Sequence, residues 1–321
     1  MALGVATGTN ITVTMTGPDG GNVRCRLAAP LGPTSCCARF GRCLDYAYVV
    51  LFSRTEIGDS EGTAVTRAVD RASQILLALA SGTPRLGVSE ISDLVDVPKP
   101  TVHTMLRTLE RRGLVVQEVD GGKYALGPAV LQLGNAYLGG SELRARSASW
   151  SDMLARQAGE AVWVAVLSGP NVVVVHHTLR PDDLVQILEV GAAVPWHASA
   201  LGRAIVAYTP DDAQRALLAS PLRRLTGKTV TDPDALRQEL AAVLTRGYAV
   251  EDEEATLGDA GLAAPVFNWS GRVVGALGIV GPVTRLLTEA RQDRLADAVR
   301  STARALSRDL GAGRAVSAAG E

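Results

Sequence analysis

Cysteine is scarce in this sequence and confined to one end of it. The four cysteines, Cys25, Cys36, Cys37 and Cys43, all lie within the first 43 of 321 residues. Their spacing contains no C-x-x-C pair, and no cysteine later in the chain could bridge to them. This distribution disfavours both a disulfide framework and a structural zinc site.

Long apolar runs are also missing. No uncharged apolar run reaches the roughly 18 to 20 residues that a membrane-spanning helix needs. The first 62 residues are rich in Gly, Thr, Ala and Pro and hold no compact basic-then-apolar signal segment. We therefore expect a soluble, cytoplasmic protein without a membrane partner. Residues 1–62 are predicted to be a disordered tail or to precede the natural translation start.

An excess of one charge is lacking as well. The chain has 32 Lys and Arg residues against 33 Asp and Glu residues, a net charge of −1. Such a balance argues against a protein that coats nucleic acid by bulk charge. Any contact with DNA must therefore be local, and dimerisation would reinforce it.

Catalytic signatures are absent too. The sequence contains no G-x-S-x-G elbow, phosphate-cradling glycine loop or H-E-x-x-H motif. One cluster, His176, His177, Asp182 and Asp183, could approach a metal, but adjacent histidines on a strand point to opposite faces. We predict no enzyme, no catalytic residue, no metal and no cofactor. A metal-dependent enzyme using His176, His177 and Asp182 is the remote alternative.

The most informative feature present is a run of three apolar stripes followed by a hairpin pattern between Val65 and Gly127. The stripes have helical spacing and consist of Val65, Val69, Ala72, Leu76 and Leu79, then Val88, Ile91 and Leu94, then Val102, Leu106 and Leu109. Two strands are expected at 114–118 and 123–126, around Asp120-Gly121-Gly122. This order predicts a winged helix-turn-helix, whose partner is double-stranded operator DNA.

Local signals place the ends of these helices. Ser89 is positioned to cap the second helix, and Lys99-Pro100 opens the third with proline in its first turn. The segment Asp96-Val97-Pro98 is then the turn between the two helices. A small helical bundle with a solvated face, or a protein-interaction module, is the alternative interpretation.

Residues off the third apolar stripe are the candidates for DNA contact. Polar side chains on the outward face would meet base edges, and basic residues at the helix ends and on the hairpin would meet phosphates. Arg107 is expected to contribute to specific operator affinity. The predicted DNA-binding residues are Ser89, Lys99, Pro100, Thr101, His103, Thr104, Arg107, Thr108, Arg111 and Lys123.

The second half of the chain alternates short β-branched runs with helical stretches. Strands are expected at 161–167, 172–177, 185–190, 248–251, 262–267 and 273–280, and helices at 128–138, 142–157, 199–208, 211–219, 232–246 and 288–310. The turn at 268–271 joins two strands directly, which favours an antiparallel sheet. The fold class is therefore α+β, with a winged domain at 63–127, linker helices at 128–157, a second domain at 142–312 and a tail at 313–321.

Four segments resemble the IclR family of transcriptional regulators. They are VPKPTVH at 97–103, PWHASALGRA at 195–204, GYAVEDEE at 247–254 and GIVGP at 278–282. The resemblance implies an N-terminal winged helix-turn-helix joined by a helix to a C-terminal GAF-like effector-binding domain. Within the family, the chain is most similar to regulators of glycerol operons, through segments around 142–146, 176–183 and 307–314.

The resemblance also implies where a small-molecule effector would bind. Glu251 stands where many members have aspartate, Gly261 where some have cysteine, and Gly278 and Val280 where keto-acid-binding members have serine. We expect these changes to alter effector choice, because a pocket group without its partner costs free energy. The expected effector-binding residues are Leu188, His197, Ala200, Leu201, Glu251, Gly261, Gly278 and Val280.

The anticipated function is regulation of a catabolic operon, glycerol utilisation in particular, by a small anionic metabolite such as glycerol 3-phosphate. Backbone N–H groups of Ala200 and Leu201 at a helix start would attract an anion, with Arg180, His197 and Arg203 as further donors. Arg203 could instead be a surface charge, and His197 a structural residue. Regulation of another catabolic pathway is the alternative, and a homodimer or homotetramer is expected.

Overall fold

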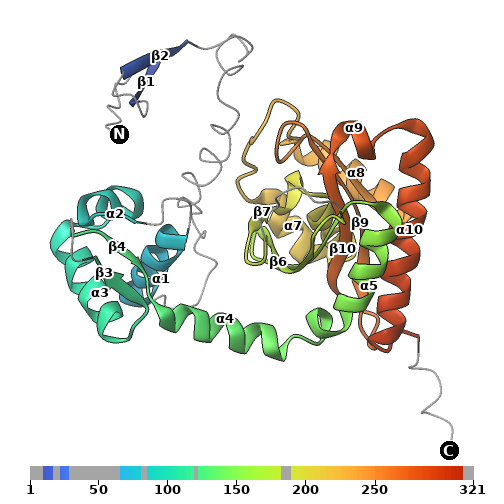
Figure 1. The fold of residues 1–321 in the computed structure, drawn as a ribbon, viewed down its shortest axis with the longest axis horizontal. Coiled ribbons are helices and arrows are strands. Elements are labelled where there is room, and N and C mark those ends of the chain that lie inside the picture. Colours follow the sequence, from blue (N-terminus) through green and yellow to red (C-terminus); the bar gives the residue numbers. More distant parts are fainter. Residues whose placement is uncertain are drawn as a thin grey trace, which may run out of the picture. The chain divides into compact units, whose positions relative to one another are not determined.

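The structure is a computed structural model that describes residues 10–16, 22–28, 66–80, 85–118, 122–181 and 189–313. The chain divides into two compact units, residues 1–128 and 129–321 (Figure 1). The division falls at the start of the helix α4 (Pro128–Gly140). Among the described helices, none is long and apolar enough to cross a membrane.

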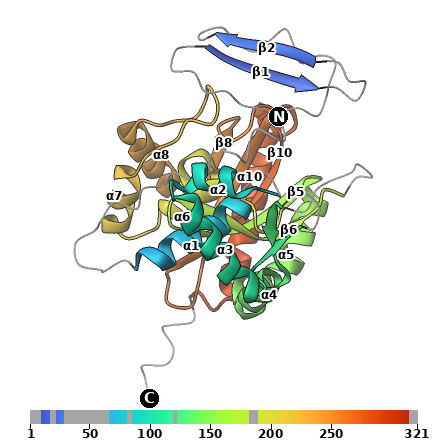
Figure 2. The same cartoon turned by 90° about the vertical axis from the view of Figure 1, so that its left-hand side faces the viewer.

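The first unit contains a winged helix-turn-helix. The helices α1 (Arg67–Ala80), α2 (Val88–Val95) and α3 (Lys99–Arg111) precede the antiparallel strands β3 (Val115–Gln117) and β4 (Tyr124–Leu126) (Figure 1). Figure 2 shows the three helices from another side. Leu86 pairs with Tyr124 and widens the wing by one bridge. All three helices and the wing contribute to one core, formed by Ile75, Ala78, Leu79, Leu86, Ile91, Val95, Val97, Val102, Leu106, Leu109, Val115 and Tyr124.

The start of α2 differs from the sequence prediction. Gly87 is its N-cap, and the Glu90 carboxylate accepts a hydrogen bond from the Gly87 N–H at 2.7 Å. A glutamate three residues into a helix can reach back to the capping residue in this way. Ser89 lies inside the first turn, so the prediction that it caps α2 is wrong.

Two short strands lie in the N-terminal region. The strands β1 (Asn10–Thr16) and β2 (Asn22–Ala28) pair in antiparallel register, with Val13 opposite Cys25. The segment 1–62, predicted to be a disordered tail or to precede the natural translation start, thus includes these two strands of seven residues each. Cys36, Cys37 and Cys43 lie outside the described residues.

The second unit is built on a six-stranded antiparallel sheet with strand order β7-β6-β5-β10-β9-β8, which confirms the α+β class. Its strands are β5 (Ala161–Ser168), β6 (Asn171–Thr178), β7 (Ala193–Pro195), β8 (Ala249–Asp252), β9 (Asp259–Phe267) and β10 (Val273–Pro282). The strand expected at 185–190 lies mostly outside the described residues. The edge strand β7 follows it and was not predicted.

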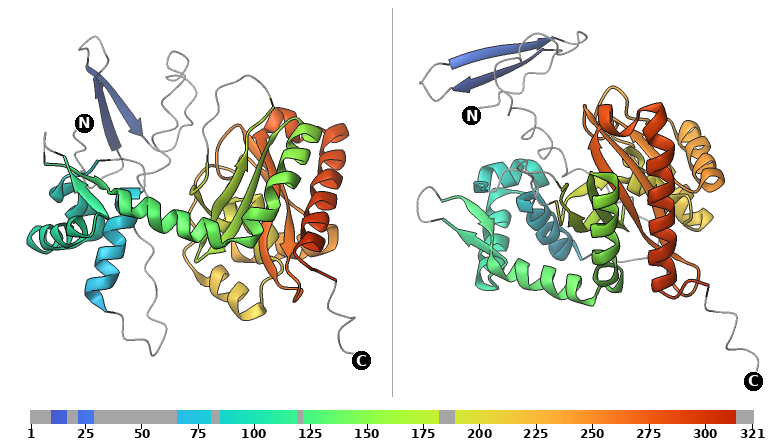
Figure 3. Two further views of the ribbon diagram at one scale, coloured as in Figure 1. Left: turned by 60° about the horizontal axis from the view of Figure 1, so that its bottom comes forward. Right: turned by 45° about the vertical axis from the view of Figure 1, so that its right-hand side comes forward.

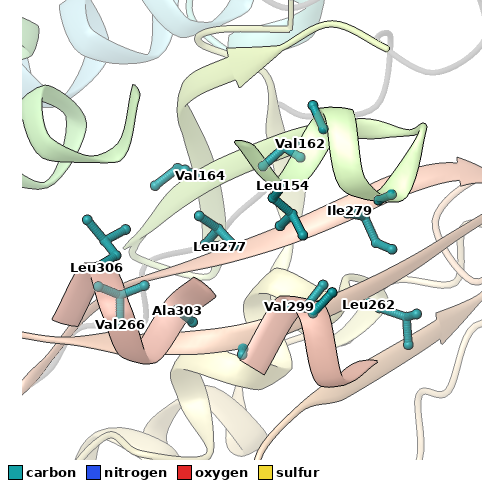
Figure 4. Packing of buried hydrophobic residues seen from close by; sticks show 14 of the residues in the cluster. Leu154, Val162, Val164, Leu262, Val266, Leu277, Ile279, Val299, Ala303 and Leu306 are labelled. Carbon is teal, nitrogen blue, oxygen red and sulfur yellow. The ribbon is translucent and has the colours of Figure 1, made fainter. Parts of the chain in front are cut away.

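Helices cover both faces of this sheet. On one face lie α5 (Glu142–Ala158) and α10 (Glu289–Asp309), which run side by side in both views of Figure 3. Leu154, Val162, Leu277, Val299 and Leu306 pack between these helices and the sheet (Figure 4). Because alternate residues of each strand point this way, the other residues form a second face.

The opposite face is covered by shorter helices. They are the 3-10 turn η1 (Trp196–Ala198), α6 (Ala200–Val206), α7 (Asp211–Ala219) and α8 (Pro233–Arg246), while α9 (Val283–Leu286) follows β10. Asp232 caps α8 by accepting from the Ala235 N–H at 2.9 Å, and Gly247 ends it with φ 78°. A second core, in which alanines pack with larger residues such as Trp196 and Leu236, joins α6 to the sheet.

Candidate DNA and effector sites

The outward face of α3 is polar and exposed. Val102, Leu106 and Leu109 are buried in the core of the first unit, and Met105 packs against it, while the polar residues between them face away. The structure leaves Lys99, Pro100, His103, Thr104, Arg107, Thr108 and Arg111 exposed, and Thr101 half-buried. These eight predicted DNA-binding residues therefore share one accessible helix. Ser89 is exposed on α2.

Two threonines on this face have their hydroxyl hydrogens directed into the helix. Thr104 Oγ1 donates to the Pro100 carbonyl at 2.9 Å, and Thr108 Oγ1 donates to the Thr104 carbonyl at 3.1 Å. Both side chains then present an oxygen lone pair and a methyl group outward. In the major groove these groups suit a base amino group and the thymine methyl.

The basic side chain of the wing, Lys123, lies close to the start of α2. Exposed Lys123 lies with its Nζ 3.9 Å from Glu90 Oε2, the carboxylate that also binds the Gly87 N–H. At the other end of the wing, a Cβ on Gly127 would lie 2.1 Å from the Gly113 carbonyl oxygen. The absence of a side chain at Gly127 thus lets the wing return directly beneath the end of α3.

The predicted effector residues on the strands gather on the α6-facing side of the sheet. In the strand register, Gly261 lies opposite both Glu251 and Val280, and Gly278 lies opposite Ala263. A Cβ on Gly261 would lie 3.2 Å from Glu251 Oε2 and 3.4 Å from Ala200 Cβ. Glu251, Gly261 and Ala200 are therefore direct neighbours, with Val280 and Gly278 beside them on the next strand.

Glu251 is a buried carboxyl group in this cluster. Burial raises its pKa to about 7, against the lowering effects of the Ala255 N–H, which donates to Oε1 at 3.2 Å, and of nearby Arg203. Glu254 and Asp259 raise the pKa further. Near neutral pH this side chain can thus exchange between an acceptor and a hydrogen-bond donor.

Arg203 is buried, and the suggestion that it is only a surface charge is wrong. Its side chain is 2% exposed, and its Nη2 donates to Glu254 Oε1 at 2.7 Å. A charge this deep is tolerated because it has an ionic partner. Glu254 was missed by the sequence analysis, since nothing in a single sequence relates two residues 51 positions apart.

His197 is held by the backbone. Its Nε2 lies 2.9 Å from the Arg223 carbonyl oxygen, and burial lowers the pKa of the imidazole. This contact supports the structural interpretation of His197. Just after it, a Cβ on Gly202 would lie 2.2 Å from the Trp196 carbonyl oxygen, so α6 can fold back closely on η1. Leu201 is buried in α6, and Leu188 lies outside the described residues.

The histidine pair on β6 is divided between the two sheet faces. His176 Nε2 lies 3.3 Å from Thr178 Oγ1, which also donates to Asp152 of α5 at 3.1 Å. His177 instead pairs across the sheet with Trp163. Within the described residues no group of three or more His, Cys, Asp or Glu side chains could hold a metal, and Asp182 is not among those residues.

Comparison with known proteins identifies both units. Residues 68–119 match the IclR helix-turn-helix domain, and residues 135–308 match the bacterial transcriptional regulator IclR C-terminal model. The chain belongs to the IclR family. The glycerol operon regulatory protein of Streptomyces coelicolor is 45% identical over 249 residues, which cover 77% of this chain and 98% of that protein. The BhcR regulator of Paracoccus denitrificans is 33% identical over 77% of this chain and 88% of its own.

Solved structures of IclR regulators share the fold. A putative regulator from Silicibacter has a TM-score of 0.68 at 27% identity, covering 77% of this chain and 97% of its own. A Brucella abortus IclR regulator has a TM-score of 0.69 at 25% identity, covering 79% and 96%. These relatives are transcriptional regulators, not enzymes, so the chain is an IclR-family regulator with a DNA-binding and an effector-binding domain.

Proposed function

We propose that this IclR regulator controls a glycerol utilisation operon. The supporting observation is its 45% identity to glycerol operon regulatory proteins of two Streptomyces species across 98% of their length. Identity at this level extends over both units and therefore includes the operator-facing helix as well as the effector domain. The proposal gives the chain one DNA partner and one small-molecule partner.

On the DNA side, the exposed face of α3 would enter the major groove. His103, Thr104 and Arg107 would meet base edges, while Lys99, Arg111 and Lys123 would contact phosphates. Because the net charge of the chain is −1, one such unit offers few cations. Two units on a roughly palindromic operator would double these contacts.

A second copy would pair through α4. None of its residues, all of them described, is buried within the chain. Leu133 and Tyr137, one helical turn apart, are 63% and 58% exposed. Large apolar side chains exposed together are typical of an interface, and this helix supports a homodimer that could pair again to a tetramer.

On the effector side, a small anionic metabolite such as glycerol 3-phosphate would lie over Gly261 and Gly278. Gly261 lies next to the Glu251 carboxyl group and Ala200, so a ligand there would be close to Glu251 and to the backbone N–H groups of Ala200 and Leu201. Binding would favour one arrangement of the two α3 helices over another, and α5 would carry that preference from the effector domain.

Titration of operator complexes tests this proposal. The full-length protein is mixed with its own upstream DNA at two salt concentrations, with competitor DNA present, and glycerol 3-phosphate is added. Specific binding should weaken steeply with salt, and glycerol 3-phosphate should change the affinity for operator. Binding that does not respond to glycerol 3-phosphate would reject the effector, and no retarded complex at low salt would reject this operator.

Regulation of a catabolic operon by an uncharged effector is the second candidate, and one observation favours it. The cationic side chains near the site are already engaged, Arg203 by Glu254 and His197 by the Arg223 carbonyl. A phosphate group would then depend on backbone donors, whereas an uncharged effector would not need a cation. Release of operator by glycerol but not by glycerol 3-phosphate would favour this uncharged class.

A further inference from the structure

His177 lies on the same sheet face as the glycines of the effector site. It pairs in register with Trp163, which pairs in turn with Gly278. The rings of His177 and Trp163 meet edge to face, with centroids 5.8 Å apart. Trp163 is half-buried, and Gly278 lets the neighbouring strand approach closely, since a Cβ there would lie 2.7 Å from Ala263 Cβ.

The protonation of the His177 ring is fixed by a backbone contact. The Glu189 N–H donates to Nδ1 at 3.0 Å, so this nitrogen must keep its lone pair. Burial lowers the pKa of His177, and neighbouring His176 lowers it further. A neutral imidazole that accepts at Nδ1 carries its proton on Nε2.

That Nε2–H group is buried without a hydrogen-bond partner in the part of the chain that the structure describes. His177 as a whole is 9% exposed. Buried donors are almost always satisfied, because leaving water without a new partner costs free energy. An acceptor oxygen brought by a ligand would recover this cost.

The two polar groups of the site, the His177 imidazole and the Glu251 carboxyl group, lie on strands that are well separated in the sheet. His177 is on β6 and Glu251 is on β8, with β5, β10 and β9 between them. The imidazole lies beside Trp163 of β5, edge to face, and the carboxyl group of Glu251 extends over Gly261 of β9. The strands β6 and β9 are three spacings apart, roughly 14 Å, so a ligand that contacts both groups would cross β5 and β10.

We propose that His177 Nε2–H donates a hydrogen bond to the effector and requires an acceptor oxygen at the end of the effector that lies over β5 and β6. Glu251 then faces the opposite end. This assignment rests on the proposed function, since it takes the glycine-lined face as the effector site. It replaces the metal-ligand role considered for His177 with that of a specificity-determining donor.

The tautomer can be measured without any effector. The chain has four histidines. Nitrogen-15 NMR of the full-length protein can therefore assign each ring, because each single histidine variant removes the signals of one ring. We expect His177 at pH 7.5 to carry its proton on Nε2 and none on Nδ1. An Nδ1–H tautomer or an imidazolium ion at this pH would overturn the proposal.

Two substitutions separate the donor from the acceptor of the ring. His177→Asn keeps an acceptor for the Glu189 N–H but has no donor at the Nε2 position, whereas His177→Gln keeps a donor near that position. With glycerol 3-phosphate as probe in calorimetry, His177→Asn should weaken binding about tenfold, as expected for one lost hydrogen bond. His177→Gln should weaken it by less than about threefold.

His176→Asn is the matched control, because the neighbouring ring faces α5 on the other side of the sheet. It should leave glycerol 3-phosphate affinity unchanged. Equal affinities of His177→Asn and the wild type, with folding confirmed by thermal melting, would overturn the donor role. If the wild type does not bind glycerol 3-phosphate, that ligand is rejected, and the measured tautomer decides whether His177 is a donor.

Discussion

The helices α3 and α6 differ in how much of their surface is buried. In α3 the core takes only the stripe of Val102, Leu106 and Leu109, and the other side faces solvent with hydroxyl, imidazole and guanidinium groups. In α6 all seven residues are buried, including the charged Arg203. A helix with an exposed polar face can bind a partner without moving, whereas a fully buried helix responds to any molecule that enters the packing around it. The first arrangement suits an output surface and the second suits an input site.

Breaking the buried ion pair of α6 should have the largest effect. Arg203→Ala leaves the Glu254 carboxylate buried without its partner, which should lower the free energy of unfolding by about 3–5 kcal/mol. All four tryptophans, Trp150, Trp163, Trp196 and Trp269, belong to residues 129–321. Their fluorescence during denaturation therefore measures this unit alone.

The exposed pair of Arg237 and Asp234 on α8 supplies the control. Arg237→Ala should change the free energy of unfolding by no more than about 0.5 kcal/mol, because solvent screens surface pairs. If the two variants lost the same stability, the distinction between a buried and an accessible charge would not hold for this molecule.

The raised pKa of Glu251 should make the second unit less stable as pH rises. Its folded pKa is raised from 4.5 to about 7, so the folded state holds the proton more tightly than the unfolded chain. The stabilisation is complete below pH 4.5 and is lost as pH rises to about 7, by up to about 3 kcal/mol. Denaturation followed by tryptophan fluorescence at pH 4.5, 6 and 7.5 measures it.

Glu251→Gln should remove this dependence, since the amide does not titrate. Glu239→Gln, at a half-buried position of α8 where the carboxylate pairs with Arg246, is the control and should keep the wild-type pH profile. A profile that is equally steep in the Glu251→Gln protein would assign the proton to another group.

A substitution on the exposed face of α3 should affect operator binding but neither stability nor effector binding. Arg107→Ala should weaken specific operator binding by about 1–3 kcal/mol, the usual contribution of an arginine that contacts base edges. Tryptophan-monitored stability and effector affinity should stay at wild-type values. Fluorescence anisotropy with labelled operator provides the measurement, and unchanged operator affinity would remove Arg107 from the interface.

The smallest change is expected at the wing. Lys123→Ala removes one phosphate contact, so affinity should fall evenly across DNA sequences and the salt dependence should decrease by about one counterion. Lys228→Ala, which removes a lysine bound to Asp252 and Glu253 of the second unit, should leave that slope unchanged. A change in base preference after Lys123→Ala would mean that the wing reads sequence.

Sequence patterns predicted the helices and most strands because their signals are local. The limits of α7 and the cap of α8 follow from short polar and proline motifs. Pairings between distant residues were not predictable in this way. Glu254 beneath Arg203, the Arg223 carbonyl on His197 and the Glu189 N–H on His177 each depend on how the folded chain brings separate segments together.

The helix α4 has a thermodynamic consequence. An isolated helix of 13 residues is marginal in water, because few turns follow its costly nucleation. Its residues gain little from burial within their own chain, and Gly134, Gly139 and Gly140 weaken the helix further. In the proposed dimer, helix formation and chain association would therefore be one coupled equilibrium, in which dilution would unwind α4 and remove the fixed spacing between operator half-sites.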